Sequence, residues 1–255
     1  AMYEAKKSGK NCFVFFNKKI SEAVDKKNKL INNINEALER NEFYMVYQPK
    51  FKYISSGKYV CSGIEALIRW DSPKLGNVRP DVFVPVIEEH GLIGEVTNWI
   101  LNKICEECQI LKNIKDFKIS INLSAKQFNN LNLAKEFSDT IAKYGLKNEM
   151  FIIEIIETTM MKNSSVTKIN LDNFNKLGFS ISVDDFGTGY SSLSYLRNFP
   201  VDEFKIDKSF TDMVLNDLQT QVIVEGIMHM CKKLEMGIVI EGVETIEQIK
   251  WFDEN

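Results

Sequence analysis

The segment SISVDDFGTGYSS, residues 180–192, decides how the chain is interpreted. It starts as an apolar, β-branched run, continues into the adjacent carboxylates Asp184 and Asp185, and breaks at Gly187 and Gly189. Asp- and Gly-rich stretches are common turns, because Asp hydrogen-bonds its own backbone and Gly adopts positive φ. Taken alone, the segment indicates a strand followed by a turn, so the rest of the chain must distinguish a turn from a site.

Composition narrows the class of protein. The chain has 255 residues, 44% hydrophobic and 26% charged, which predicts a globular fold with an ample core. A net charge of −3 without a basic run excludes the electrostatic footprint of duplex nucleic-acid binding. No apolar run reaches the length of about 18 residues that a transmembrane helix needs, and the start lacks a signal-peptide core.

We therefore expect no membrane contact from this segment and a cytoplasmic location. Five cysteines, an odd number, fit a reducing compartment. The chain begins with Ala rather than Met, so we expect it to be a piece of a longer protein, whose other segments are free to carry a membrane tether.

The cysteines and histidines do not predict a metal site. Cys105 and Cys108 form a CxxC in a stretch of helical period, and no second pair follows, which favours ordinary thiols over zinc. The two histidines, His90 and His229, are far apart in the sequence and suggest neither a metal site nor a catalytic triad.

The chain divides into three parts by pattern. Residues 1–16 predict a short helix and a strand, and residues 17–41 predict an amphipathic helix that serves as a linker. From residue 42 onward, short apolar runs alternate with helix-length stretches, as the β-α units of a parallel sheet require. The first two runs are separated by only KYISSGK, which predicts an antiparallel hairpin. The seven candidate strands are FYMVYQPKF, YVCSGIEALIRW, FKISIN, MFIIE, FSISVDD, EFKID and GIVIE.

Polar residues recur in or at the end of these runs. In a β/α barrel the carboxyl ends of the strands meet at one rim, and that rim carries the active site. A single carboxylate there would be explained by capping of the next helix, but five carboxylates on four strands indicate a site. The residues concerned are Gln48, Glu65, Asn122, Glu154, Asp184, Asp185, Lys205 and Glu241.

Charge predicts what such a site holds. Five neighbouring carboxylates repel one another, and one lysine together with two divalent cations would balance them. The donors are hard oxygens, which select Mg²⁺, Mn²⁺ or Ca²⁺ over zinc. Adjacent residues of a strand point to opposite faces, so we expect the strand to stop at Asp184 and the glycine loop to turn Asp185 back. The hypothesis is a two-metal centre for phosphoryl displacement.

Several motifs together resemble the EAL-domain cyclic di-GMP phosphodiesterases. The resemblance runs from about Glu42 to the end of the chain, and residues 1–16 resemble the end of a GGDEF domain. It implies a TIM-like (β/α)8 barrel with an antiparallel first strand, domain boundaries at 1–16, 17–41 and 42–255, and a GGDEF domain in cis. The motifs are YQPKF, GIEALIRW, INLSAKQF, IIEIIETTMM, VDDFGTGYSSLSYLRNFPVDEFKIDKSF and IEGVET.

The resemblance also implies roles for individual residues. It implies hydrolysis of cyclic di-GMP to linear pGpG with two Mg²⁺ or Mn²⁺ ions, bridged by Asp184. Lys205 would orient or deprotonate the attacking water, with a pKa lowered by the cations. Glu65, Asp184 and Asp185 would be catalytic together with Lys205. The implied metal ligands are Glu65, Asn122, Glu154, Asp184, Asp185 and Glu241; the substrate-binding residues are Gln48, Leu67, Arg69 and Asp207; and Glu157 and Glu244 would support the glycine loop and the ligands.

Two features depart from the family pattern. Ile156 stands where the family usually has Thr, so a hydroxyl near the ligands is absent. The chain ends at IKWFDEN, where the family continues into an eighth strand and a closing helix. We therefore expect the eighth strand to be missing from this chain, with two sheet edges and part of the core exposed.

Two other functions stay open at this point, a non-catalytic cyclic di-GMP receptor or interaction module and a barrel that acts on another phosphoester. The complete ligand set favours the enzyme. A homodimer is expected, in which apolar groups near the glycine loop form the interface and Glu157 anchors the loop. The groups concerned are Tyr195, Leu196, Phe199 and Phe210.

Overall fold

The computed structural model describes residues 18–55, 57–162, 164–187 and 199–255. The helix and strand expected within residues 1–16 lie outside these ranges, as do Tyr195 and Leu196 of the expected dimer interface. The chain divides into two compact units, residues 1–44 with 68–96, and residues 45–67 with 97–255.

The smaller unit is built on helix α2 (Lys18–Glu39) and helix α3 (Pro80–Glu89), which contact each other. Leu30 and Ile34 are buried on the apolar face of α2, so the amphipathic helix predicted over residues 17–41 is confirmed as a helix. Phe43, Trp70 and Phe83 form an aromatic cluster with ring centroids 5.4–5.7 Å apart. Strand β3 (Gly76–Val78) pairs antiparallel with β2; it was not predicted, because three residues are too few to show a pattern.

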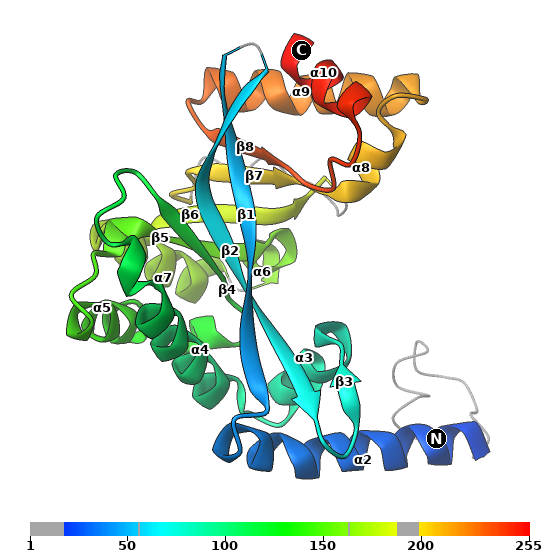
Figure 1. The fold of residues 1–255 in the computed structure, drawn as a ribbon, viewed down its shortest axis with the longest axis vertical. Helices are drawn as coiled ribbons and strands as arrows, with labels where there is room; N and C mark the ends of the chain where they lie inside the picture. Colours follow the sequence, from blue (N-terminus) through cyan, green and yellow to red (C-terminus); the bar gives the residue numbers. More distant parts are fainter. Residues whose placement is uncertain (1–17, 56, 163, 188–198) are drawn as a thin grey trace. The chain divides into compact units, whose positions relative to one another are not determined.

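The larger unit carries most of the sheet, in which the strand order is β1-β2-β4-β5-β6-β7-β8 (Figure 1). All seven predicted strands are present, β1 and β2 as an antiparallel pair and the rest as a parallel series from β2 onward. Their bounds are β1 Phe43–Ser55, β2 Lys58–Ser72, β4 Lys118–Asn122, β5 Phe151–Ile156, β6 Ser180–Phe186, β7 Glu203–Ile206 and β8 Gly237–Ile240.

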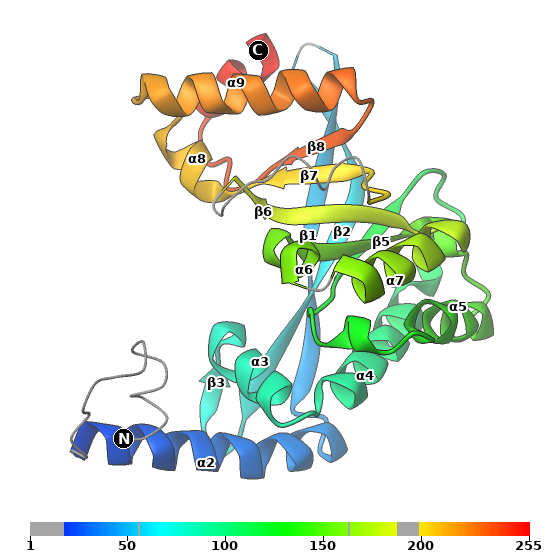
Figure 2. The same cartoon turned by 180° about the vertical axis from the view of Figure 1, so that it is seen from behind.

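Helices connect the parallel strands, as the alternating pattern predicts. Helices α5 and α7 contact each other, and α7 also contacts β6 (Figure 2). The helix bounds are α4 Ile93–Glu107, α5 Leu133–Lys143, α6 Glu157–Lys162, α7 Ser164–Lys176, α8 Lys208–Met213, α9 Leu218–Lys233 and α10 Ile246–Glu254. Within the described ranges, none of the helices combines the length and apolar character needed to span a membrane.

The burial of the strands is typical of a parallel sheet. A strand covered on both faces reads as a continuous apolar run, and the first five residues of β5, FIIEI, are all buried. Ile153, Ile181 and Phe204 of three neighbouring strands have no exposed surface. Cys105 and Cys108 are also buried, and burial raises the pKa of each thiol, as expected for core cysteines.

The sheet has two ends, β1 and β8, and no pairing joins them among the described residues. The outer part of β1 is correspondingly exposed, with Phe51, Tyr53 and Ile54 at 63%, 45% and 58% of their full surface. The expectation of an incompletely closed barrel with exposed apolar side chains agrees with this curled sheet.

Candidate active site

Polar side chains from six neighbouring strands collect at one edge of the sheet. The register sets Asn122 of β4 beside Glu154 of β5, and Asp184 of β6 beside Ile156 at the end of β5. Because the strands are parallel, their carboxyl ends share an edge, and the side chains there converge. The residues are Glu65 (β2), Asn122 (β4), Glu154 (β5), Asp184 (β6), Lys205 (β7) and Glu241, which directly follows β8.

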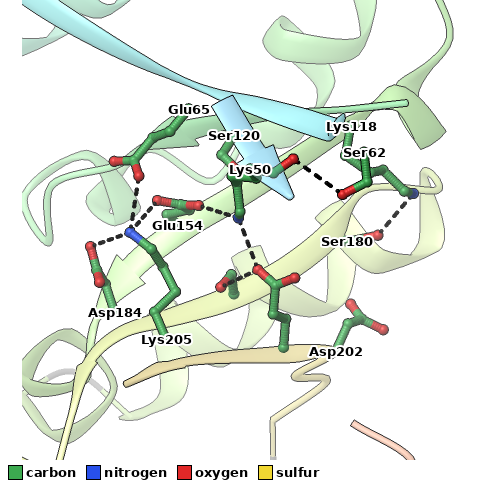
Figure 3. Close-up of polar contacts among 12 residues, drawn as sticks. Lys50, Ser62, Glu65, Lys118, Ser120, Glu154, Ser180, Asp184, Asp202 and Lys205 are labelled. Atoms are coloured by element: carbon green, nitrogen blue, oxygen red, sulfur yellow. Dashed lines mark hydrogen bonds and ion pairs between the residues drawn. The ribbon is translucent and has the colours of Figure 1, made fainter. Parts of the chain in front are cut away.

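The ammonium group of Lys205 lies at the centre of this cluster (Figure 3). Its Nζ atom is 3.0 Å from Glu154 Oε2, 3.1 Å from Asp184 Oδ2 and 3.2 Å from Glu65 Oε2. Glu241 Oε1 is closer still, at 2.7 Å. The Lys205 side chain is only 2% exposed, so a buried cation joins carboxylates from four other strands or strand ends. The structure thus brings five of the residues expected at this rim into contact with one another.

Asp184 and Asp185 are oriented by a different device from the one predicted. Strand β6 continues to Phe186, and the register to β7 shifts between Val183 and Phe186, as in a β-bulge. Asp185 adopts a left-handed backbone, φ +57°, which Asp tolerates better than most residues. The prediction that the strand stops at Asp184 is therefore wrong, because the bulge breaks the alternation of the side chains within the strand.

Burial and mutual repulsion disfavour the ionised form of several carboxylates of the site. Burial raises the pKa of Glu65, and the nearby charge of Glu154 raises it further. Burial likewise raises the pKa of Glu241, and that of Asp185 is raised by burial and then by Asp184 and Asp207. Burial alone would also raise the pKa of Glu154, but its two lysine partners outweigh that effect and lower it. Added positive charge would stabilise the ionised cluster.

In the absence of cations, the pKa of Lys205 is raised rather than lowered. Burial favours the neutral amine, but Glu154, Asp184, Glu65 and Glu241 outweigh it, so the pKa of Lys205 lies well above its ordinary range. The expected lowering assumed neighbouring cations, and the carboxylates by themselves have the opposite effect. In this environment Lys205 is a protonated group that orients its neighbours.

The donor set fits hard divalent cations in its chemistry. All the charged donors are carboxylates, and the amide nitrogen of Asn122 donates to Glu65 Oε1 at 2.8 Å, so the amide oxygen is not used in that bond. Across the described ranges, no three His, Cys, Asp or Glu side chains surround a common metal position. Instead, the Lys205 ammonium lies between the carboxylates, so it must move aside for a cation to bind at that point.

The two supporting glutamates lie in different settings. Glu157 is buried at the start of α6, and its Oε2 lies 3.4 Å from the backbone N–H of Gly187, which donates to it at the beginning of the glycine loop. Glu244 is exposed and forms an ion pair with Lys208 that lowers the pKa of Glu244. The geometry is thus consistent with a loop-holding role for Glu157, whereas Glu244 contacts a helix residue.

The residues expected to bind substrate lie on different elements of the two units. Gln48 is exposed on β1, and Leu67 is half-buried on β2. Arg69 belongs to the smaller unit, where its guanidinium donates to the carbonyl of Ile68 at 2.9 Å. Asp207 caps the N-terminus of α8 by accepting from the backbone N–H of Ser209 at 3.0 Å. The roles of these four residues stay predictions.

The sequence motifs did not lead to the prediction of one charged residue of the site, Lys50. Its Nζ atom lies 3.2 Å from Glu154 Oε1, the oxygen that Lys205 does not contact (Figure 3). The signal was present in the sequence, because Lys50 follows Gln48 by two residues and alternate residues of a strand share a face. It was overlooked because a lysine near a strand end usually extends into solvent.

These features define a class of protein, a β/α barrel-type fold with an acidic, lysine-centred site at the carboxyl edge of its parallel strands. Residues 31–255 match the EAL domain, and the chain belongs to that family.

Two curated relatives come from Pseudomonas aeruginosa. The chain is 35% identical over 250 residues to the bifunctional diguanylate cyclase/cyclic di-GMP phosphodiesterase MucR, and covers 36% of that protein. It is 30% identical over 257 residues to the cyclic di-GMP phosphodiesterase NbdA and covers 32% of it. These matches include 97% and 100% of this chain, which thus spans about a third of each relative.

Solved structures agree in fold. The phosphodiesterase of MucR in complex with c-di-GMP superposes with a TM-score of 0.81 at 34% identity, over 89% of this chain and 91% of that one. The EAL enzyme Bd1971 with cAMP and cyclic-di-GMP bound gives a TM-score of 0.83 at 31% identity, over 91% of this chain and 63% of that one.

Proposed function

We propose that this chain is the catalytic EAL domain of a phosphodiesterase that hydrolyses cyclic di-GMP to linear pGpG. The observation that carries the proposal is the cluster of Glu65, Glu154, Asp184 and Glu241 around Lys205 at the carboxyl edge of the sheet. Carboxylates clustered in this way can hold two divalent cations, and such a pair of cations stabilises both the attacking and the leaving oxygen in phosphodiester hydrolysis. The likeness to the phosphodiesterases MucR and NbdA supports cyclic di-GMP as the substrate.

Two divalent cations, Mg²⁺ or Mn²⁺, are part of the proposal. Bound to the site, they would supply an activated water and neutralise charge that develops on the phosphate. The ligands would be Glu65, Asn122, Glu154, Asp184, Asp185 and Glu241, the oxygen donors that these cations prefer.

The residues of the chain then orient the attacking water and the carboxylates. The protonated Lys205 side chain orients the attacking water and holds the carboxylates in place. The water oxygen forms a bond to phosphorus and releases a proton, and the bond from phosphorus to the 3′ oxygen breaks as that oxygen takes up a proton, so that the phosphate remains on the 5′ side as in pGpG.

The setting of the domain is also a proposal. We infer that residues 1–16 end a GGDEF domain in cis and that α2 connects it to the EAL domain. A cytoplasmic location fits the free thiols of Cys61, Cys105, Cys108 and Cys231.

A homodimer near the glycine loop is proposed too. Among its expected groups, Phe199 is half-buried with the Lys168 ammonium 6.0 Å from its ring centroid, and Phe210 is half-buried beside Gly187.

The function is tested by incubating the chain with cyclic di-GMP and Mg²⁺ or Mn²⁺ and separating the products by chromatography. We expect pGpG to accumulate, and we expect no product in the presence of a chelator. Binding of cyclic di-GMP without hydrolysis in either metal would replace the enzyme with a nucleotide receptor. Hydrolysis of other phosphodiesters but not of cyclic di-GMP would replace the substrate.

A further inference from the structure

Glu154 is held by two lysines, one on each oxygen. Lys205 contacts Oε2 at 3.0 Å, and Lys50 contacts Oε1 at 3.2 Å (Figure 3). Glu154 has no exposed surface, so the lysines take the place of water as its hydrogen-bond donors. The two lysines come from β1, at one end of the sheet order, and from β7, the strand next to the other end.

The hydrogen-bond capacity of Lys50 is fully used. An ammonium group has three donors, and Lys50 Nζ has acceptors in Ser120 Oγ at 3.1 Å, Glu154 Oε1 at 3.2 Å and Glu203 Oε1 at 3.1 Å. Its side chain is 13% exposed. A charged group satisfied in this way has one preferred position, because any displacement leaves a donor or a carboxylate unpaired.

Further hydrogen bonds fix the Glu203 partner of Lys50 and the backbone of Lys50. The Ser182 hydroxyl donates to Glu203 Oε1 at 3.0 Å, so the carboxylate that anchors Lys50 is itself fixed by β6. The Ser62 hydroxyl donates to the carbonyl of Lys50 at 3.4 Å, which attaches the backbone of β1 to β2. Lys50 and Glu203 carry opposite charges, so this ion pair adds no net charge to the neighbouring carboxylate cluster.

We propose that Lys50 is a positioning residue, which holds the carboxylate of Glu154 in the orientation that cation binding requires. The inference rests on the proposed function, in which Glu154 is a ligand. Groups that orient ligands in this way typically change metal affinity by about ten- to a hundredfold when they are removed.

Position and charge predict opposite effects. If Lys50 contributed only its charge, its removal would strengthen cation binding, because a positive charge near the site repels cations. If it positions Glu154, its removal weakens cation binding, because the ligand loses its orientation. The sign of the change in affinity therefore distinguishes the two roles.

The experiment measures Mn²⁺ binding by the chain without nucleotide, from the electron paramagnetic resonance signal of free Mn²⁺. We expect Lys50→Met to weaken binding by about tenfold or more. The matched control is Lys52→Met, which removes the same charge from an exposed position two residues along β1 and should leave binding unchanged. Unchanged or tighter binding in Lys50→Met would overturn the proposal.

A double variant covers the case in which Lys50→Met alone fails to fold. Lys50→Met/Glu203→Gln removes both charges of the Lys50–Glu203 ion pair, so the half-buried Glu203 is not left without its charged partner. We expect its Mn²⁺ binding to remain weak, whereas binding restored to the wild-type value would show that Lys50 only neutralises Glu203. If the wild-type chain binds no Mn²⁺, the proposed function loses its cations, a result that is separate from the comparison of variants.

Discussion

Replacing Lys205 by Met should expose the repulsion among the carboxylates as a loss of stability. The ammonium group has four carboxylate oxygens within 2.7–3.2 Å and is almost fully buried. Removing one partner of a buried ion pair costs about 3–5 kcal/mol, because the remaining charge is left uncompensated. Lys50 still holds Glu154, so we expect a loss near the lower end, about 3 kcal/mol, in a chelating buffer.

Divalent cations should reverse much of this loss. A cation present at about a hundred times its dissociation constant stabilises the folded state by about 2.7 kcal/mol. Met leaves the carboxylates without their central positive charge, so Mn²⁺ should stabilise Lys205→Met more than the wild-type chain. Urea unfolding with EDTA and with Mn²⁺ measures both effects, and Lys52→Met serves as an exposed control expected to stay within about 0.5 kcal/mol of wild type.

A loss below about 1 kcal/mol in EDTA would refute this reasoning, since such a value is typical of an exposed pair. An equal effect of Mn²⁺ on both chains would also refute it, because the variant site would then attract cations no more strongly than the original.

Three further predictions concern single side chains. Glu65→Gln should abolish hydrolysis of cyclic di-GMP with an unchanged circular dichroism spectrum, and wild-type turnover would contradict its role as a ligand. Asp185→Asn keeps a residue that tolerates φ +57° but removes a charge disfavoured by burial, so in EDTA it should unfold at an equal or higher urea concentration while turnover is lost; a clear loss of stability would oppose this. Gly242→Ala and Gly57→Ala both place a side chain at positive φ, but only at position 242 would the new Cβ meet another side chain, Lys208 Cγ at 2.4 Å. Gly242→Ala should therefore cost about 1–3 kcal/mol more, and equal costs would show that Lys208 moves freely.

The alternation of apolar runs and helix-length stretches was enough to predict the architecture. All seven strands in the sheet order were expected, because buried parallel strands such as FIIEI have few other interpretations. Strand β3 was missed, since its three residues depend on pairing with β2 rather than on a pattern of their own. Local sequence thus predicts elements well where burial dictates composition.

The site was predictable in its members but not in its details. The spacing of Glu65, Glu154 and Glu241 at strand ends predicted that they converge, and they do so around Lys205. The bulge at Asp185 could not be read from the sequence, because it arises from a shift in pairing with β7. Lys50 was missed because its contacts also depend on how distant strands pair.

Which carboxylate a lysine meets depends on the twist and register of strands that are distant in sequence. Lys50 bridges Glu154 and Glu203, which lie 104 and 153 residues away along the chain. Asp207, whose substrate-binding role stays a prediction, caps the N-terminus of α8. Contacts of this kind follow from tertiary structure, so spacing along the chain does not reveal them.

The central claim is that the acidic, lysine-centred site directs water onto a phosphodiester of cyclic di-GMP. The most direct measurement is hydrolysis with Mn²⁺ in water labelled with heavy oxygen, followed by mass spectrometry of the nucleotide product. The account predicts pGpG with one labelled oxygen on its terminal phosphate, and no product from Glu65→Gln. Recovery of unchanged cyclic di-GMP, or of pGpG without the label, would contradict it.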